Sequence, residues 1–320
     1  MKKIALLIAY FGNLPGYSAV FFETLRRNPG LDLLLITDQT VVSPPENLKV
    51  YTTSFKALQK RIQSKFDFPI VLDRPYKLCD YKPAYGYIFE EELQDYAFWG
   101  HCDLDMVLGD VCKFLPNDIL NIYDKIYQLG HLCLYRNSPE NNKRFMETGG
   151  MDYRRVLTTP IICVFDEIIG MQRKYELLGI PTYTAKDCAD ISPWHYTFQR
   201  VESHLTEEEK KHFNYDRQVF FWEDGHVYRA AEVNGQIIYD EFNYLHFQKR
   251  NLGFVGQIAE FPQAFYCTRN GFVEKEAGFH VTLEDIEKYN GANWIGHLRA
   301  RIKYHSFIFK RRYNKYILKK

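Results

Sequence analysis

Hydrophobic and polar positions alternate in blocks along the first hundred residues. Continuous apolar runs, typical of buried strands, lie at residues 3–12, 31–38, 48–53 and 97–109. Segments with the apolar spacing of amphipathic helices lie at residues 16–30, 54–66 and 82–96. Pro83 suits the first turn of the last of these helices. Strands that alternate with helices predict an α/β, Rossmann-like fold with a mainly parallel central sheet flanked by helices.

The middle of the chain is less regular, and its predicted elements are a strand, a helix and a loop at residues 130–137, 165–180 and 187–193. Asn234-Gly235, between two alternating segments, predicts a small β-hairpin region within residues 226–247. Thr282, with Asp285 three residues later, predicts the capped start of a late helix.

The charge distribution sets the C-terminal end apart. The 320 residues have a formal net charge of +1, but residues 295–320 hold nine Lys or Arg and no Asp or Glu, so the remainder carries −8 (+1 minus +9). Apolar and aromatic residues lie between these cations. This pattern predicts contact with an anionic membrane surface; the alternatives are a solvated helix or contact with nucleic acid. We expect a main domain over residues 1–260 and a basic helical region over residues 261–320.

Cysteine usage and hydropathy bear on the compartment. The seven cysteines are scattered and form no CxxC pair, which is typical of reduced, buried thiols and not of a disulfide framework or zinc site. No small-residue cleavage site follows the apolar N-terminus, and no run reaches the ~20 apolar residues that span a bilayer. We therefore expect a cytoplasmic protein, peripheral on the inner face of the cell membrane if the basic segment binds lipid.

Polar residues cluster where three predicted strands end, at residues 10–12, 37–38 and 103–105. In open parallel sheets, ligands bind at the carboxyl ends of the strands. Two carboxylates one residue apart, Asp103 and Asp105, can present oxygens to one Mn²⁺ or Mg²⁺, which then binds a diphosphate. Because Asp-x-Asp is frequent by chance, the alternative is a strand that ends in solvent.

Other residues strengthen the metal-and-phosphate interpretation. Asp38, which follows Thr37, can hold a ribose or a base. Far downstream, His246 precedes Lys249 and Arg250. A neutral imidazole can complete a metal shell, and a nearby cation can bind phosphate. By itself, His246 is also compatible with an ordinary, partly buried histidine.

The combination resembles the nucleotide-sugar-dependent glycosyltransferases of the GT-A fold, especially bacterial enzymes that build capsule, O-antigen or lipooligosaccharide chains. The resemblance rests on the motifs AYFG, LITD, KLCDYKPAYGYIF, WGHCDLDMVLGD and HFQKR. It covers residues 3–250 in the order of elements, although only these short motifs are specific. A GT-A-like fold is what the resemblance implies.

The resemblance also implies roles for individual residues. Asp103 and Asp105 are implied to bind Mn²⁺ or Mg²⁺ on the donor diphosphate. The residues implied to lie around the nucleoside are Tyr10, Phe11 and Asp38. His246 resembles the late metal-ligand histidine of some retaining members. Those members usually carry His-x-x-Gly-x-x-Lys-Pro-Trp, whereas this chain has His-Phe-Gln-Lys, so both retaining and inverting chemistry stay open.

Further polar residues fit the same site. Asp80 and Lys82 precede a predicted helix N-terminus, where a cation and free backbone amides favour an anionic diphosphate. The alternative for this pair is a capping aspartate and a solvated lysine. Lys249 is the downstream cation expected to bind phosphate.

The acceptor side is defined less sharply. Asp187 or Asp190 can supply the base that deprotonates the acceptor hydroxyl in an inverting enzyme, or hold the donor sugar in a retaining one. Trp194 can stack on a sugar face, and His195 lies beside it. Rival sources of the base are Glu223, Asp224 and His226.

Together these residues predict a metal-dependent glycosyltransferase of the hexosyltransferase type. The expected donor is a nucleotide-diphosphate sugar, with UDP favoured. The acceptor is a saccharide or lipid-linked saccharide in cell-surface polysaccharide biosynthesis. One alternative is a metal-dependent phosphoesterase, with His101 and Asp110 as further ligands; another is a non-catalytic, degenerate transferase that acts as a binding protein. Nucleic-acid binding has no motif to support it.

Overall fold

The structure is a computed structural model that describes residues 3–184, 187–191, 197–201, 206, 208, 213–248, 250–278, 280–290, 295, 298–299, 301–302 and 305–306. The chain divides into two compact units, the first made of residues 1–104 and 112–185 and the second of residues 105–111 and 186–320. The expected division near residue 260 stays a prediction. The units are described in turn.

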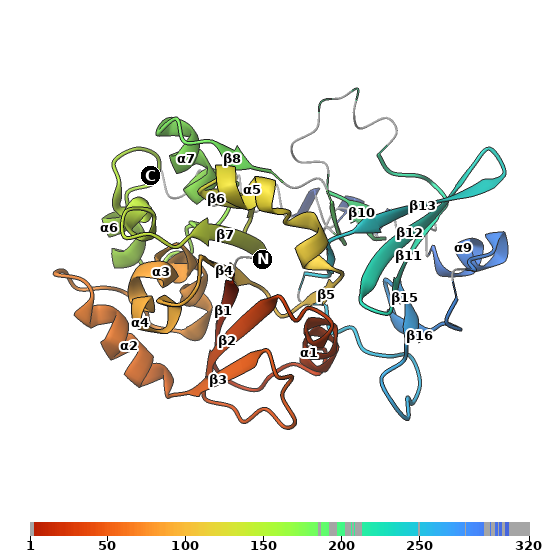
Figure 1. The fold of residues 1–320 in the computed structure, drawn as a ribbon, viewed down its shortest axis with the longest axis horizontal. Coiled ribbons are helices and arrows are strands. Elements are labelled where there is room, and N and C mark those ends of the chain that lie inside the picture. Colours follow the sequence, from red (N-terminus) through yellow and green to blue (C-terminus); the bar gives the residue numbers. More distant parts are fainter. Residues whose placement is uncertain are drawn as a thin grey trace. The chain divides into compact units, whose positions relative to one another are not determined.

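The first unit is built on one seven-stranded sheet. Its strands are β1 (Ile4–Tyr10), β2 (Leu31–Thr37), β3 (Leu48–Thr52), β4 (Phe98–Cys102), β6 (Lys125–Leu129), β7 (Leu132–Arg136) and β8 (Thr182–Tyr183). Their order is β3-β2-β1-β4-β7-β6-β8 (Figure 1). The strands β3, β2, β1 and β4 run parallel, whereas β7 is antiparallel to β4 and β6. The strands predicted over residues 3–12, 31–38 and 48–53 and the mainly parallel arrangement are therefore confirmed, whereas only residues 98–102 of the segment 97–109 belong to this sheet.

Apolar residues on both faces of β1 explain its central position. Ile4 to Ile8 are all buried, so both faces of the strand are covered. On one face, Ala5 and Leu7 share a core with Leu58 of α2 (Phe55–Ser64) and Tyr85 of α3 (Tyr85–Ile88). Alternation of side chains across the strand turns its other apolar residues to the opposite face. The sheet therefore lies between two apolar layers, as expected for an α/β unit.

The helical segments of the first unit are mostly short. Besides α2 and α3 they are α1 (Ser18–Arg26), α4 (Glu90–Leu93), α5 (Asn117–Ile122), α6 (Tyr153–Thr158) and α7 (Arg173–Leu177). A π-helical turn lies at Ile168–Gln172, and 3₁₀ turns lie at Pro75–Ala84, Val111–Phe114 and Asn141–Met146. Helix α2 begins after Ser54, whose hydroxyl accepts a hydrogen bond from the Ala57 backbone amide at 3.1 Å.

The single helix predicted over residues 82–96 is wrong. A 3₁₀ segment contains Pro83 near its end, and two one-turn helices, α3 and α4, follow it. Helical geometry is lost at Phe89, whose φ of −112° and ψ of 32° separate α3 from α4. The helix predicted over residues 165–180 is likewise shorter and starts as a π turn, in which Gly170 lies against the Phe165 backbone.

The second unit contains two sheets. A four-stranded sheet has the order β10-β9-β14-β5, with strands β5 (Met106–Leu108), β9 (Cys188–Asp190), β10 (Gln199–Arg200) and β14 (Tyr244–His246). A five-stranded antiparallel sheet has the order β13-β12-β11-β15-β16, with strands β11 (Gln218–Glu223), β12 (His226–Val233), β13 (Gln236–Phe242), β15 (Ala264–Thr268) and β16 (Gly271–Glu274). The loop predicted over residues 187–193 is therefore wrong in part, because pairing with β14 makes residues 188–190 a strand.

Two local predictions in the second unit are confirmed. Asn234 and Gly235 form the β12–β13 turn with φ of 52° and 78°, as a tight hairpin requires. Helix α9 (Leu283–Tyr289) starts at Thr282, which forms a reciprocal capping box with Asp285. Among the described residues, no helix is long and apolar enough to cross a membrane. Most of the basic segment 295–320 lies outside the described residues.

Candidate functional site

The carboxyl edge of the first sheet holds the residues predicted to bind a nucleoside. In the order 3-2-1-4, the chain reverses direction across the sheet between β1 and β4, and ligands bind outside the strand ends at such a point. Asp38, just after β2, accepts hydrogen bonds from the Gly12 backbone amide at 3.0 Å and from Gln39 Nε2 at 2.9 Å. These bonds from Gln39 and Gly12 lower the pKa of Asp38. The hydrogen bond from Gly12 thus holds the exposed Asp38 carboxylate beside the end of β1.

Tyr10 and Phe11 differ in what they offer a ligand. Tyr10 ends β1 and is half-buried. Phe11 is only 8% exposed, and its ring centroid lies 5.3 Å from that of Phe55 in the core. Their assignment to the nucleoside stays a prediction, in which Tyr10 has the more accessible side chain.

Asp80 lies in the interior of the first unit. Its carboxylate pairs with Lys77 Nζ at 2.7 Å, and both side chains are fully buried. It also accepts backbone hydrogen bonds from Cys163 at 2.9 Å and Phe165 at 3.0 Å. These partners hold the 161–165 segment against the residues before α3. We therefore assign Asp80 a structural role in place of the predicted donor contact.

Lys82, Asp103 and Asp166 form a charged cluster at the end of β4. Lys82 Nζ lies 2.8 Å from Asp103 Oδ1 and 3.1 Å from Asp166 Oδ2, and it donates to the Gly130 carbonyl at 2.9 Å. The Lys82 side chain is only 13% exposed. The structure thus brings Lys82 and Asp103 together, and Lys82 is not the solvated lysine of the alternative interpretation.

Burial and charge act in opposite directions on this cluster. Burial alone would lower the pKa of Lys82, but Asp103 and Asp166 outweigh it and hold that pKa well above its ordinary value. Burial raises the pKa of Asp166 to about 7 against the opposing effect of Lys82. The cluster therefore keeps a protonated lysine between two acidic groups.

His246 lies between two carboxylates in the four-stranded sheet of the second unit. β14 pairs with β5, which follows Asp105, and with β9, which ends at Asp190. His246 Nε2 is 3.5 Å from Asp105 Oδ1, and His246 Nδ1 is 3.5 Å from Asp190 Oδ1. The Phe247 amide donates to the Asp105 carbonyl at 3.0 Å, which fixes the register of the two segments. All three side chains are buried.

This arrangement has the chemistry of a metal site. Two donors of one octahedral ion, each about 2.1 Å from it, lie roughly 3 Å apart, close to the separation of His246 Nε2 and Asp105 Oδ1. Metal-bound histidines commonly direct their other ring nitrogen to a carboxylate, as His246 does to Asp190. Gln248 Nε2 in turn donates to Asp190 Oδ2 at 2.7 Å. Asp105 and His246 therefore fit a divalent cation, and Asp190 fits the role of orienting the imidazole.

The charge state of His246 follows from its neighbours. Burial alone would lower its pKa, but the carboxylates of Asp105 and Asp190, each 3.5 Å from a ring nitrogen, raise it to about 10. Asp187 lies one residue before β9 and forms no ion pair within the part of the chain that the structure describes. Burial raises the pKa of Asp187 to about 6, with only a weak opposing effect of Arg200. Asp187 thus has the shifted pKa that a general base near neutral pH requires.

The remaining candidates fall into two groups. Lys249, Trp194 and His195 lie outside the described residues. The rival bases include Glu223, which pairs with Lys275 at 2.9 Å, and His226, which pairs with Glu241 at 2.9 Å. Glu223 and His226 lie on strands of the five-stranded sheet, and these contacts pair their side chains with other residues of the second unit.

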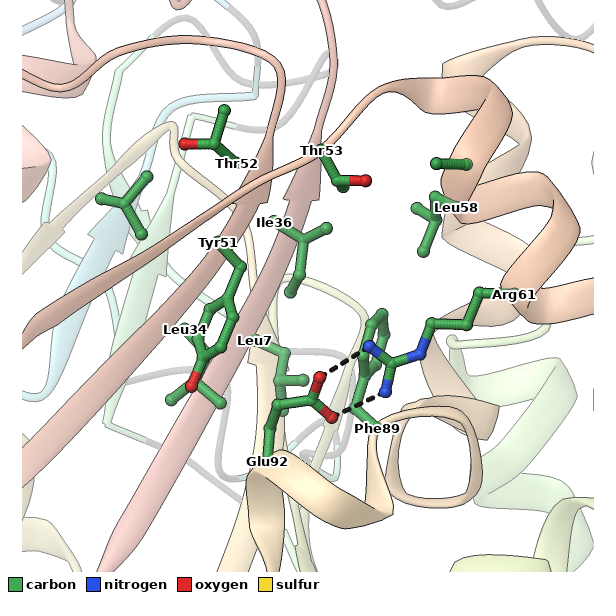
Figure 2. Close-up of a pocket in the computed structure, with 12 residues that line it drawn as sticks. Leu7, Leu34, Ile36, Tyr51, Thr52, Thr53, Leu58, Arg61, Phe89 and Glu92 are labelled. Atoms are coloured by element: carbon green, nitrogen blue, oxygen red, sulfur yellow. Dashed lines mark hydrogen bonds and ion pairs between the residues drawn. The ribbon is translucent and has the colours of Figure 1, made fainter.

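A cavity of about 410 Å³ also lies in the first unit (Figure 2). Its floor is apolar, with Leu7, Leu34 and Phe89, and Arg61 binds Glu92 through two contacts of 2.6 and 2.7 Å. None of the predicted site residues lines it. Thr52 and Thr53, at the carboxyl end of β3, also line it, so the cavity reaches this edge of the sheet.

Sequence analysis missed Asp166 and the orienting contact of Asp190. Asp166 lies 84 positions after Lys82 within a segment predicted as helix, and no local motif marks it. Asp190 was predicted as a base, but the pairing of β9 with β14 places its carboxylate beside the His246 imidazole. A strand assignment for residues 188–190 was the one signal that would have indicated this contact.

A parallel sheet with a polar carboxyl edge, together with a histidine flanked by carboxylates, defines a mixed α/β protein with a candidate metal site. Residues 6–276 match the model of the Family of unknown function (DUF6625), and the chain belongs to this family. No curated protein matches its sequence. Among solved structures, the chain is similar to mouse xyloside xylosyltransferase 1 in its apo form. The identity is 8%, the TM-score is 0.35, and the match covers 77% of this chain and 97% of that chain. A similarity of this degree does not define an activity.

Proposed function

We propose that this protein is a metal-dependent glycosyltransferase. It moves a sugar from a nucleotide-diphosphate donor, with UDP as the favoured nucleotide, to a saccharide acceptor. The observation that carries the proposal is His246, whose Nε2 faces Asp105 while its Nδ1 faces Asp190. Asp105 is also the second carboxylate of the Asp-x-Asp pattern. One pattern in the sequence and one contact in the fold thus support the same metal ligand.

The donor set favours Mn²⁺ over Mg²⁺, because imidazole is a ligand for transition-series cations whereas Mg²⁺ takes oxygen ligands. When bound, the cation supplies Lewis-acid stabilisation of the diphosphate leaving group. In the proposal, Asp105 and His246 are ligands and Asp103 is the further ligand predicted from the sequence. Asp190 keeps the imidazole in the tautomer that leaves Nε2 free for coordination.

Other residues bind and orient the substrates. Asp38, positioned by Gly12, holds the nucleoside, and Tyr10 lies at the same strand end. Lys82 offers a cation to the donor phosphates. Asp187 is the proposed base for the acceptor hydroxyl, since its raised pKa favours proton uptake near neutral pH. This assignment corresponds to inverting chemistry.

The test uses the full chain with a panel of nucleotide sugars, simple saccharide acceptors and Mn²⁺. The proposal expects transfer or slow donor hydrolysis with Mn²⁺, and loss of both with EDTA. Asp105→Asn is expected to abolish turnover, whereas the exposed Asp118→Asn leaves it unchanged. Absence of transfer, donor hydrolysis and a thermal shift with UDP or GDP would reject the proposal.

The same assay separates a phosphoesterase. Phosphate release from simple phosphoesters, without inhibition by nucleoside diphosphates, would replace the transferase with that activity. Inhibition of turnover by UDP is the outcome that supports the transferase.

We further propose that the acceptor is lipid-linked and belongs to cell-surface polysaccharide synthesis at the inner face of the membrane. The basic residues of segment 295–320 support this part, because Lys and Arg near an anionic surface each contribute about 1 kcal/mol. Binding to vesicles with and without anionic lipid tests it. Equal binding to both vesicle types would contradict it.

A further inference from the structure

Lys82 in the first unit is bound by three fixed acceptors. Its ammonium lies 2.8 Å from Asp103 Oδ1, 3.1 Å from Asp166 Oδ2 and 2.9 Å from the Gly130 carbonyl. A lysine ammonium has three N–H donors, so these contacts use its full donor capacity. The Lys82 ammonium thus contacts Asp103, the carboxylate that the Asp-x-Asp pattern predicts to be a metal ligand.

The two carboxylates that share Lys82 differ in exposure. The Asp166 side chain is 6% exposed, whereas the Asp103 side chain is 33% exposed. Leaving a buried carboxylate without its cation is costly, but a partly exposed carboxylate can exchange partners. Asp166 and Gly130 are therefore the anchors of Lys82, and Asp103 is its exchangeable partner.

Gly130 makes this anchor possible. A Cβ at residue 130 would lie 2.7 Å from Asp166 Oδ2 and 2.8 Å from Glu167 Oε1. Only a glycine lets the backbone carbonyl and the Asp166 carboxylate approach the same ammonium without displacement. The Asp103 amide also donates to the His131 carbonyl at 3.1 Å, which holds the end of β4 beside this segment.

We propose that Lys82 is a built-in counter-cation for Asp103. It neutralises Asp103 when no divalent cation is bound, and it moves fully onto Asp166 and the Gly130 carbonyl when a divalent cation binds Asp103. The proposal rests on the proposed function, because it takes Asp103 to be a metal ligand. A divalent cation repels the ammonium, and Asp166 remains to receive it. The N–H released from Asp103 then donates to a donor phosphate oxygen, which couples metal binding to donor binding.

This exchange predicts opposite effects for two variants on Mn²⁺ affinity. Lys82→Met removes the competing cation and is expected to tighten Mn²⁺ binding by roughly tenfold. Asp166→Asn removes the group that receives the displaced ammonium and is expected to weaken Mn²⁺ binding by a similar factor. The measurement is a titration of the full chain with Mn²⁺ alone, with free Mn²⁺ read by electron paramagnetic resonance.

Three comparisons isolate the exchange. Lys143→Met removes the same charge from an exposed site in the first unit and is expected to leave Mn²⁺ affinity unchanged. Lys82→Arg keeps the cation and is expected to restore affinity close to that of the wild type. In the Lys82→Met background, the weakening by Asp166→Asn is expected to disappear, because Asp166 acts through Lys82.

The outcomes separate this inference from the proposed function. Tighter binding by Lys82→Met supports the exchange and cannot arise from misfolding. If the wild type binds Mn²⁺ and Lys82→Met binds it no more tightly, the exchange is overturned while the metal site stands. Weakening by both variants also overturns it, since a purely structural role of Lys82 gives that result. If the wild type binds no Mn²⁺, the proposed function itself fails.

Discussion

Each unit of the chain holds one basic side chain between two carboxylates, and the two clusters differ in the base. In the first unit, Lys82 lies between Asp103 and Asp166; in the second, His246 lies between Asp105 and Asp190. The lysine contacts are 2.8 and 3.1 Å, whereas both histidine contacts are 3.5 Å. The short contacts are direct charge-assisted hydrogen bonds, and the long ones lie beyond the usual hydrogen-bond range.

The difference shows that the identity of the basic residue decides whether a cluster with two carboxylates can coordinate a metal ion. An ammonium has donors only, so it neutralises carboxylates but cannot coordinate a metal. A neutral imidazole that keeps its Nδ1 proton and directs it to a carboxylate presents a lone pair at Nε2. Lys82 can balance its carboxylates only as a cation, whereas His246, which is protonated when no metal is bound, can lose its Nε2 proton to solvent and coordinate a divalent cation instead.

Removing the imidazole has the largest expected effect. His246→Ala deletes a proposed ligand and should weaken Mn²⁺ binding by more than about 100-fold, with sugar transfer lost in parallel. Isothermal titration with Mn²⁺ and the transfer assay measure these losses. The exposed His280→Ala is the matched control and should behave as the wild type. Unchanged Mn²⁺ affinity in His246→Ala would remove the distinction between the two clusters.

Weakening the orientation of the imidazole has the next largest effect. Asp190→Asn keeps the size of the side chain but removes the charge that faces Nδ1, and it should lower Mn²⁺ affinity by about 10- to 100-fold. The loss should appear in metal affinity, with the melting temperature nearly unchanged. Asp216→Asn, at an exposed position in the same unit, serves as control. A loss of turnover at saturating Mn²⁺, with normal metal affinity, would return Asp190 to the role of a base.

Asp187 sharpens the comparison as a half-buried carboxylate that forms no ion pair with the described residues. Burial raises its pKa to about 6, above the value of about 3.9 for an unfolded chain. The folded state therefore binds the proton more tightly, and stability falls as pH rises from about 4 to about 6. Asp187→Asn removes this loss. The variant should be more stable than the wild type at pH 8 by roughly 1 to 3 kcal/mol, with the gain absent at pH 4. Urea unfolding at both pH values measures the gain, and equal gains at both would contradict the assignment.

Gly130→Ala tests the packing of the lysine cluster and has the smallest expected effect. The added methyl group must displace Asp166 and Glu167, which should cost about 1 to 2 kcal/mol in the free energy of unfolding. Gly16→Ala is the matched control, because nothing lies within 4 Å of its added Cβ. Equal stability of the two variants would mean that residue 130 does not set the position of Asp166.

The sequence predicted the parallel strands well, because their signal is local. A run such as residues 4–8 is apolar at every position, which is the pattern of a strand buried on both faces. The hairpin at Asn234-Gly235 and the helix cap at Thr282 are local for the same reason. Residues 82–96 were misassigned because their apolar spacing continues through Phe89, where the backbone leaves the helical region between α3 and α4.

The candidate site was predictable only in part. Asp105 was identified from the Asp-x-Asp pattern at a strand end, and His246 from its place before two cations and from the resemblance. The partners of the bases come from pairing between distant segments: Asp190 reaches His246 through the β9–β14 register, and Asp166 reaches Lys82 across 84 positions. The strand β9 has only three residues, Cys188–Asp190, and Asp187 precedes it. This short polar sequence predicts a loop. Asp80 shows the converse, since it was predicted to contact the donor, whereas its carboxylate pairs with Lys77 in the interior.

The central claim is that His246 and Asp105 hold a divalent cation. Pulsed electron paramagnetic resonance of Mn²⁺ bound to the full chain tests it most directly, because a coordinated imidazole nitrogen couples to the electron spin of the ion. The account predicts a ¹⁴N coupling in the wild type that is absent in His246→Gln. Bound Mn²⁺ without nitrogen coupling, or the same coupling in His246→Gln, would contradict it.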